Sequence, residues 1–306
     1  MKSFAFLGLA LVLTMASASS LHSNIYHGDP VANDQQFPAV VAIYEIVPFM
    51  GSTMRDQDAE CTGTLIADRW VVTAGHCVLA HTDDDVANDK IVSPEKIAVG
   101  LGFNARHAKN ANTIVSVEKI VTWQDRQISF DPNHDIALLK LSQPVTNISP
   151  AQLPESANDF VDLKSGVHTA TAVGYGWTSQ AARDGILHYG SEVIQPDEIV
   201  ETLIKKYSAP TVNPSPYETP SYNLFSMLGV TSPTGQHGTS GDSGGPLFSA
   251  SASNPAQVVI GIDSWGVGDP TRAMLNSGEF DKLPEVYTNL LYAEHLDFVK
   301  KTIKNG

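Results

Sequence analysis

The chain has 306 residues, of which 42% are hydrophobic and 17% are charged, a composition typical of a globular protein with a sizeable core. Its formal net charge of −14 argues against nucleic acid and anionic membranes as partners, because both bind basic patches. The acidic balance favours solubility but does not identify a ligand.

The N-terminus has the layout of a secretory signal peptide. Lys2 supplies a positive charge, residues 4–15 are almost continuously apolar, and residues 16–18 are small enough for a cleavage site. The apolar run is too short to span a membrane, and no later stretch is long enough. We therefore predict a signal peptide at residues 1–18 and a soluble protein that is secreted to the extracellular space. A buried N-terminal helix is the alternative.

Cys61 and Cys77 are the only cysteines of the chain. In an exported protein an even pair of cysteines predicts a disulfide, although two cysteines alone are no disulfide framework. Closing a loop of this size stabilises a fold by about 3 kcal/mol. A chain of this length buries enough core not to depend on that contribution.

In chain order, the body of the sequence consists of short runs of β-branched and aromatic residues separated by turns. Two helices interrupt and end the series, at residues 198–206 and 291–304, where apolar residues recur at helical spacing and lysines come late. No linker and no internal repeat is visible. The pattern predicts an all-β fold, a barrel or a sandwich. The expected strands are residues 40–44, 63–66, 70–73, 97–100, 114–121, 136–141, 170–173, 258–262 and 286–288.

Three separate segments carry residues suited to nucleophilic catalysis. His76 follows a predicted strand, Asp135 leads into another, and Ser243 stands among glycines. A serine hydroxyl is a weak nucleophile near neutral pH and needs a base, and the base needs a carboxylate that fixes its tautomer. Taken singly, each residue is more often structural. Together they predict a catalytic triad.

The glycines around Ser243 have a separate role. Without β-carbons, the backbone can turn its N–H groups toward a developing oxyanion. Gly241 and Ser243 are the expected donors of this oxyanion hole. Removing one such donor costs about 3–4 kcal/mol of transition-state stabilisation.

The segment around Ser243 also fits the Gly-x-Ser-x-Gly nucleophile elbow of the α/β hydrolases. That alternative requires an acid and a histidine after the serine, and Asp263 or Asp269 and His295 have this order. An elbow turns from a strand into a helix, however, whereas residues 245–248 continue as loop and strand. The local context therefore disfavours the elbow.

Together, the three segments resemble the motifs of the trypsin/chymotrypsin-like serine proteases. His76 lies in Thr-Ala-Gly-His-Cys, Asp135 in Asp-Ile-Ala-Leu-Leu and Ser243 in Gly-Asp-Ser-Gly-Gly-Pro, in that family's order. The resemblance runs from Ile25 to the C-terminal helix. It implies a serine protease domain at residues 25–306, built from two antiparallel β-barrels with the catalytic cleft between them and a C-terminal α-helix.

The resemblance assigns further residues. Cys61 and Cys77 match the cysteines that brace the histidine loop, and residues 174–177 resemble the glycine–tryptophan segment that begins the second barrel. The strand that pairs with the substrate backbone is matched by Ser264, Trp265 and Gly266.

Residues 25–28 resemble the N-terminus that family members expose when their zymogen is cleaved. The freed amine of Ile25 would pair with Asp242, and because a buried pair needs both charges, the cleavage would act as a switch. Removal of the signal peptide would leave a short propeptide at residues 19–24. Asn24 precedes Ile25 where arginine or lysine is usual, so we expect a processing enzyme that cuts after asparagine.

The expected specificity pocket departs from the family pattern. His237 stands where trypsins carry an aspartate that binds basic side chains, and Glu285 replaces a pocket glycine. Asp263 occupies a position where an apolar residue is common. The disulfide that braces this pocket in relatives is missing, and Thr239 takes one of its positions.

Three interpretations of this pocket remain open. Glu285 and His237 could pair across the pocket floor and leave little net charge for the substrate. A surplus of negative charge from Glu285 and Asp263 would instead favour a basic side chain, which is our first expectation, with small or apolar side chains next. In the third case these side chains point away from the pocket.

We therefore expect a secreted serine endopeptidase, made as a zymogen, that hydrolyses protein or peptide substrates through an acyl-enzyme. Its other expected partners are protein protease inhibitors, and we expect a monomer. No cofactor is expected, and no metal, because residues 103–112 contain no carboxylate. The alternative is a catalytically inactive homologue that binds or inhibits a partner, although such homologues normally lose a triad residue.

Overall fold

The computed structural model describes residues 25–26, 28–49, 52–55, 58–80, 90–107, 113–125, 131–156, 160, 162–177, 184–207, 221–249, 258–267 and 283–306. The predicted signal peptide at residues 1–18 and the predicted propeptide at residues 19–24 lie outside these residues. In the described ranges, no helix is both long enough and apolar enough to cross a membrane.

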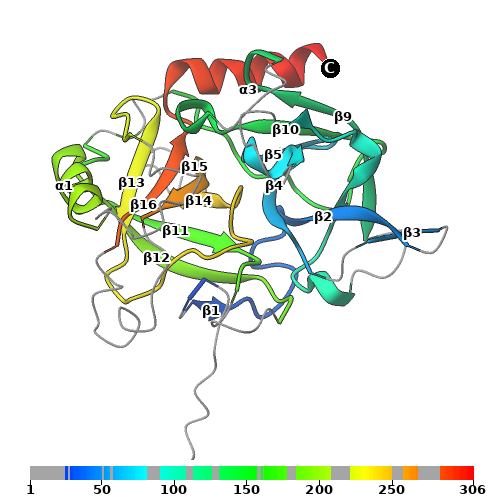
Figure 1. Cartoon of the computed structure of the whole chain (residues 1–306), viewed down its shortest axis with the longest axis horizontal. Coiled ribbons are helices and arrows are strands. Elements are labelled where there is room, and N and C mark those ends of the chain that lie inside the picture. Colours follow the sequence, from blue (N-terminus) through cyan, green and yellow to red (C-terminus); the bar gives the residue numbers. More distant parts are fainter. Residues whose placement is uncertain are drawn as a thin grey trace, which may run out of the picture.

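The N-terminal half forms a closed antiparallel barrel (Figure 1). Its strands are β2 (Val40–Phe49), β3 (Ser52–Arg55), β4 (Cys61–Ala67), β5 (Trp70–Thr73), β8 (Ile97–Gly100), β9 (Ile114–Thr122) and β10 (Ala137–Leu141). The order β2-β4-β5-β10-β9-β8 closes on itself because β8 also pairs with β2, and β3 pairs with β2 outside this ring.

The C-terminal half forms a second closed antiparallel barrel. Its strands are β1 (Asp29–Pro30), β11 (Thr169–Gly174), β12 (His188–Ile194), β13 (Met227–Thr231), β14 (Pro246–Ser249), β15 (Val258–Gly266) and β16 (Glu285–Asn289). The order β12-β11-β14-β15-β16-β13 closes because β13 also pairs with β12, and β1 pairs with β12 from outside.

Among the described residues, two α-helices lie outside the barrels, α1 (Asp197–Tyr207) and α3 (Ala293–Asn305). Although α3 follows the second barrel in the chain, Figure 1 shows it extending over the first. Phe298 of α3 packs edge-on against Trp123, with ring centroids 5.3 Å apart. The remaining short elements of the described residues are β6 (Leu79–Ala80), β7 (Lys90–Ile91) and the 3-10 helices His76–Val78, Pro94–Lys96, Ala105–His107, Trp123–Asp125 and Pro132–His134.

A shared apolar core joins the two barrels. Successive side chains of a strand point to opposite faces, and on β2 both faces are buried. Val41 and Ile43 face the interior of the first barrel, whereas Val40 belongs to a cluster that includes Val173 and Phe248 of the second barrel. This cluster fixes one barrel against the other, and the predicted double-barrel fold with a C-terminal helix is confirmed.

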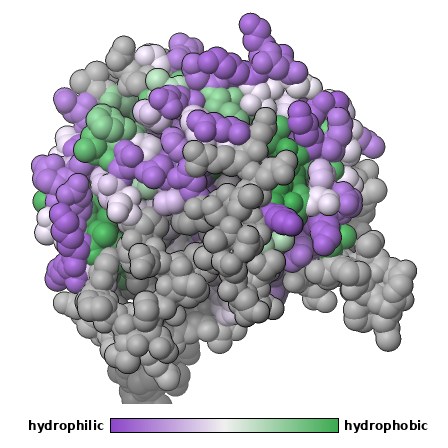
Figure 2. Space-filling view, turned by 45° about the horizontal axis from the view of Figure 1, so that its top comes forward, coloured by the Kyte–Doolittle hydropathy of each residue, from purple (hydrophilic) through white to green (hydrophobic). Residues whose placement is uncertain are grey.

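Figure 2 shows one face of the molecule, on which hydrophilic residues cover most of the coloured surface. The hydrophobic areas between them are small. A mainly hydrophilic surface around an apolar core is usual for a globular protein.

Candidate active site

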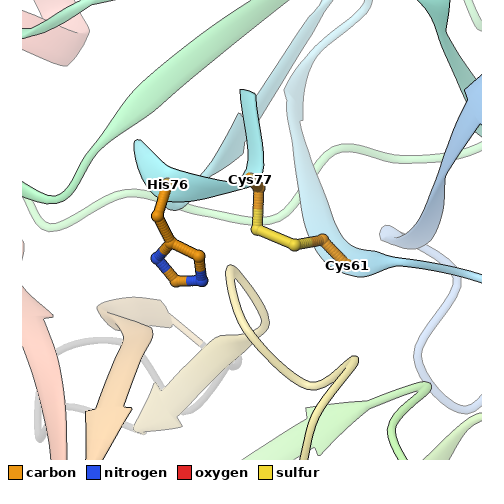
Figure 3. A group of neighbouring side chains, drawn as sticks. All are labelled: Cys61, His76 and Cys77. Carbon is orange, nitrogen blue, oxygen red and sulfur yellow. A yellow bond between two sulfur atoms is a disulfide. The ribbon is translucent and has the colours of Figure 1, made fainter. Parts of the chain in front are cut away.

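His76 lies just after β5, at the start of a 3-10 helix that a disulfide holds in place. The disulfide joins Cys77, the next residue of this helix, to Cys61 at the start of β4, with Cα atoms 6.1 Å apart. Figure 3 shows the imidazole and the disulfide leaving the helix in different directions. The predicted disulfide is therefore present, and it anchors the backbone next to the histidine.

Asp135 is buried directly before β10 and contacts His76 twice. Its Oδ1 accepts a hydrogen bond of 2.8 Å from the backbone N–H of His76, and its Oδ2 lies 2.8 Å from the ring Nδ1. Ser264 Oγ donates to the same Oδ2 at 2.6 Å, and Thr288 Oγ1 donates to the Asp135 carbonyl at 2.9 Å. These contacts fix the carboxylate and assign the proton to Nδ1, so that Nε2 is the basic nitrogen.

The same contact determines how strong a base His76 is. Burial lowers the pKa of the imidazole, but the charge of Asp135, its hydrogen bond and the charge of Asp263 outweigh burial and raise the pKa above the ordinary 6.5. A raised pKa gives the neutral imidazole more affinity for a proton, as a general base requires.

Ser243 lies in a tight turn packed against β4. Its carbonyl accepts a hydrogen bond of 2.8 Å from the N–H of Thr62 and lies 3.5 Å from Sγ of Cys77. Gly241 has a φ of +103° and Gly244 a φ of +81°, and a Cβ on Gly244 would collide with the carbonyl oxygen of Thr62. The turn therefore needs glycine on both sides of the serine.

Two amide groups of this turn have no acceptor among the described residues. In the part of the chain that the structure describes, the N–H groups of Gly241 and Ser243 make no hydrogen bond, whereas the N–H of Asp242 donates to Thr239 at 2.9 Å. Most backbone donors in a folded protein are paired. Both N–H groups are therefore free to donate a hydrogen bond, and their role as an oxyanion hole stays a prediction.

The far end of β15 presents the residues expected to align a substrate. β14 pairs with β15 only as far as Ile262. Beyond that point Ser264 is buried against the Asp135 carboxylate, Trp265 is half-buried and Gly266 is exposed. One edge of this segment is therefore left uncovered by β14.

His237 and Glu285 are buried beside each other. Nδ1 of His237 donates to the carbonyl of Gly238 at 2.8 Å and lies 3.4 Å from Oε1 of Glu285. A Cβ on Gly266 would stand 3.5 Å from the His237 ring and 3.8 Å from Glu285, so the end of β15 borders the pair. The contact between His237 and Glu285 that one interpretation expects is present.

Another carboxyl group of this region belongs to Glu192 on β12. The sequence does not predict its position, because β12 is not among the predicted strands. Glu192 is 1% exposed. Its Oε1 and the Oε2 of Glu285 are buried without a hydrogen-bond partner within the described ranges. Buried carboxylate oxygens of this kind are costly unless they are protonated or receive a cation.

The pKa values of the pocket residues follow from that cost. Burial and the charge of Asp242 raise the pKa of Glu285 to about 8, and burial followed by the charge of Glu285 raises the pKa of Glu192 and Asp263 well above their usual range. Burial lowers the pKa of His237. Burial therefore favours the neutral form of each of these side chains. With a pKa of about 8, the Glu285 carboxyl group is largely protonated at neutral pH.

Asp242, the residue beside the serine, is held by neutral donors in the intact chain. Its Oδ1 accepts from the N–H of Gly176 at 2.7 Å, and its Oδ2 accepts from the N–H and the Oγ1 of Thr239 at 2.8 and 3.1 Å. It makes no ion pair with any described residue. Both of its carboxylate oxygens are thus occupied before any cleavage.

Ile25 is buried, with 1% of its surface exposed. The neighbouring Tyr26 pairs with His237 through two backbone hydrogen bonds, of 2.7 and 3.1 Å. A Cβ on Gly190 of β12 would stand 3.2 Å from the Ile25 side chain. The segment around the predicted activation site therefore lies against the second barrel.

One group of possible metal ligands occurs among the described residues, formed by Cys61, His76 and Cys77 within 4.8 Å. The two sulfur atoms are joined in the disulfide. They are therefore not thiolates, which are the form of cysteine that binds metals.

Comparison with known proteins agrees with this geometry. The family model described as Trypsin matches residues 38–289. The chain is similar to a trypsin of Phaedon cochleariae, with 30% identity over 236 residues, covering 75% of the chain and 74% of that protein.

Two longer proteins are also similar. The serine proteinase stubble of Drosophila melanogaster is 27% identical over 215 residues, and the clotting factor C of Tachypleus tridentatus is 29% identical over 216 residues. Each match covers 68% of the chain, but only 24% and 20% of the respective relative. The chain thus corresponds to about a quarter or less of these two relatives.

Proposed function

The chain belongs to the trypsin family of serine proteases, and from this premise we propose that it is a secreted serine endopeptidase that works through an acyl-enzyme on Ser243. The observation that carries the proposal is the double contact of His76 with Asp135, at 2.8 Å from the backbone N–H and 2.8 Å from Nδ1. Such a contact orients a histidine as a general base.

In the proposed mechanism, Nε2 of His76 takes the proton of Ser243 Oγ as this oxygen attacks the substrate carbonyl. The N–H groups of Gly241 and Ser243 receive the charge that develops on the carbonyl oxygen. Asp135 stabilises the imidazolium, which then protonates the leaving amine. Water hydrolyses the acyl-enzyme along the same proton path.

The uncovered edge of β15 supports the proposed alignment of the substrate. An extended peptide could add to Ser264–Gly266 as a further antiparallel strand, using backbone hydrogen bonds that do not depend on sequence. The peptide would then run past Gly266, which borders His237 and Glu285. The side chain before the scissile bond would enter the pocket that these two residues line.

Within this pocket we favour a basic side chain. A lysine or arginine would supply the cation that the unpartnered oxygens of Glu285 and Glu192 lack. Because the pKa of Glu285 is raised to about 8, the preference would be strongest in alkaline solution. Small and apolar side chains match the largely neutral floor at lower pH.

Two further steps precede activity in this proposal. The signal peptide at residues 1–18 directs secretion, and cleavage after Asn24 frees the amine of Ile25 for Asp242. Ile25 and Asp242 are both buried, with 1% and 3% of their surfaces exposed, so the proposed ion pair would form away from solvent. The expected partners are protein or peptide substrates and protein protease inhibitors.

The proposal is tested by incubating protein that begins at Ile25 with a mixture of peptides and identifying the cut bonds by mass spectrometry. We expect cleavage at internal peptide bonds, and its loss in Ser243→Ala. Cleavage that persists unchanged in Ser243→Ala would assign the activity to another residue. Correctly processed protein that cuts nothing would leave the inactive homologue as the better description.

A further inference from the structure

The turn that holds Gly241 and Ser243 is tied to residues 174–177 by two threonine hydroxyl groups. Thr62 approaches from β4 of the first barrel, and Thr239 lies four residues before Ser243. Each hydroxyl contacts both the turn and the same neighbouring segment. An oxyanion hole works because its donors are already in position before the reaction.

Thr62 is fully buried, and its hydroxyl makes two hydrogen bonds. Oγ1 donates to the carbonyl of Gly241 at 2.8 Å and accepts from the N–H of Tyr175 at 3.0 Å. The backbone N–H of Thr62 also donates to the carbonyl of Ser243 at 2.8 Å. One residue of the first barrel therefore contacts both residues of the oxyanion hole.

Thr239 makes the matching contacts from the other side. Its Oγ1 lies 2.9 Å from the carbonyl of Trp177 and 3.1 Å from Oδ2 of Asp242 and can donate to either. The N–H of Trp177 donates to the carbonyl of Ser240 at 3.2 Å, which adds a direct link between the two segments. Gly176 is close enough to Thr239 and Asp242 that a Cβ there would collide with both.

We propose that Thr62 and Thr239 are positioning residues for the oxyanion hole, and that their hydroxyl groups hold the Gly241–Ser243 turn in its active shape. The inference rests on the proposed peptidase function, but the position of the turn can also be measured without catalysis.

The chain offers a matched control. Thr64 lies on the same strand as Thr62 and is equally buried, but its Oγ1 has no hydrogen-bond partner in the described part of the chain. Thr62→Val and Thr64→Val therefore make the same chemical change at the same depth, and only the first removes hydrogen bonds from the turn. Thr62→Ser and Thr239→Ser keep the hydroxyl.

Steady-state kinetics on peptide substrates gives the first readout. We expect Thr62→Val and Thr239→Val each to lower kcat by about 10- to 100-fold, because an oxyanion hole acts in the transition state. KM should change by less than about threefold, since ground-state contacts stay intact. In both valine variants, the affinity for a peptide boronate should fall by about the same factor as kcat/KM. The serine variants should recover most of the activity, and Thr64→Val should match the wild type.

Hydrogen–deuterium exchange of residues 239–245 gives the second readout, and it needs no catalysis. We expect faster exchange of this turn in Thr62→Val and Thr239→Val than in Thr64→Val. A wild type that cuts nothing would overturn the proposed function while the exchange result still tests the positioning role. Variants at Thr62 and Thr239 that equal Thr64→Val in both kcat and exchange would overturn the inference. Because Thr239 lies nearer the surface, its variant keeps the test usable if Thr62→Val fails to fold.

Discussion

At the scale of single residues, one carboxylate organises the site. The Asp135 carboxylate accepts hydrogen bonds from the backbone N–H and the ring Nδ1 of His76. It also accepts a hydrogen bond from the hydroxyl group of Ser264. The sequence motifs predict the first contact, because a base needs an orienting acid. They do not predict the second, since Ser264 comes from a strand of the other barrel and is expected only beside the substrate.

The first prediction concerns Asp135→Asn. An amide in this position cannot keep the His76 proton on Nδ1, so we expect kcat to fall by about 10⁴-fold. Loss of the negative charge should also lower the pKa of His76, which Asp135 raises. The acid limb of the kcat/KM profile should therefore move to lower pH. A loss of less than about tenfold would show that Asp135 does not orient the base.

A second prediction concerns Glu285, whose pKa is raised to about 8 by burial and the charge of Asp242. A raised pKa keeps the carboxyl group neutral below pH 8 and ionised above it. We compare kcat/KM for two peptides, one with lysine and one with leucine before the scissile bond. The ratio of the lysine value to the leucine value should rise with pH, by up to about tenfold per pH unit below pH 8. The ratio cancels the titration of His76, which affects both substrates.

Other titratable groups surround Glu285, namely Glu192, Asp263, Asp242 and His237. The matched variant Glu285→Gln removes one ionisation and keeps the shape of the side chain. Its ratio should stay flat between pH 6 and pH 9. A ratio that rises equally in Glu285→Gln would assign the preference to another carboxyl group.

At the scale of elements, the sequence predicts strands best where β-branched residues run without interruption. β5 contains such a run at residues 71–73. α1 shows helical spacing, with acidic residues in its first turn and lysines in its last turn. β12 and β13 are missed because Gly190 and Gly229 interrupt their apolar pattern. Missing β12 hides Glu192, since a residue can be assigned to a barrel interior only once its strand is known.

The motifs that hold His76, Asp135 and Ser243 could be identified from local sequence, whereas the surroundings of His237 and Glu285 could not. The motif residues keep fixed neighbours in sequence, but the pair His237 and Glu285 depends on β16 closing against the loop before Ser243. The sequence therefore leaves three interpretations of the pocket open. Only the three-dimensional arrangement brings Oε1 of Glu285 within 3.4 Å of His237.

The third prediction concerns the disulfide between β4 and the helix of His76. It closes a loop with a sequence separation of 16 residues. Replacing Cys61 and Cys77 by alanine should lower the free energy of unfolding by about 3 kcal/mol in the chain-entropy description. Denaturant titration monitored by tryptophan fluorescence measures this difference. A change below about 1 kcal/mol would mean that the loop is already ordered without the bond.

At the scale of the whole molecule, the apolar cluster between the barrels fixes the relative position of the two halves of the site. His76 and Asp135 belong to the first barrel, and Ser243 belongs to the second. The contact between the Ser243 carbonyl and the N–H of Thr62, at 2.8 Å, crosses this boundary. The site is therefore complete only when both barrels have folded and packed.

The fourth prediction concerns activation of the whole chain. Protein that begins at Ile25 should exceed the intact chain in kcat/KM by at least about 100-fold, because breaking a buried ion pair costs about 3–5 kcal/mol. Asp242→Asn should reduce the cleaved protein to the level of the intact chain. Equal activity of the intact and the cleaved protein would show instead that the neutral donors on Asp242 suffice to form the site.

The most direct test of the central claim is labelling of Ser243 by a serine-directed phosphonylating probe, on protein confirmed to begin at Ile25. Intact and peptide mass spectrometry would locate the label, with Ser243→Ala as the control. We predict one label per chain, attached to Ser243 and absent from the control. Correctly processed, folded protein that takes up no label, or that is labelled equally in Ser243→Ala, would contradict the proposal that this chain is a serine endopeptidase.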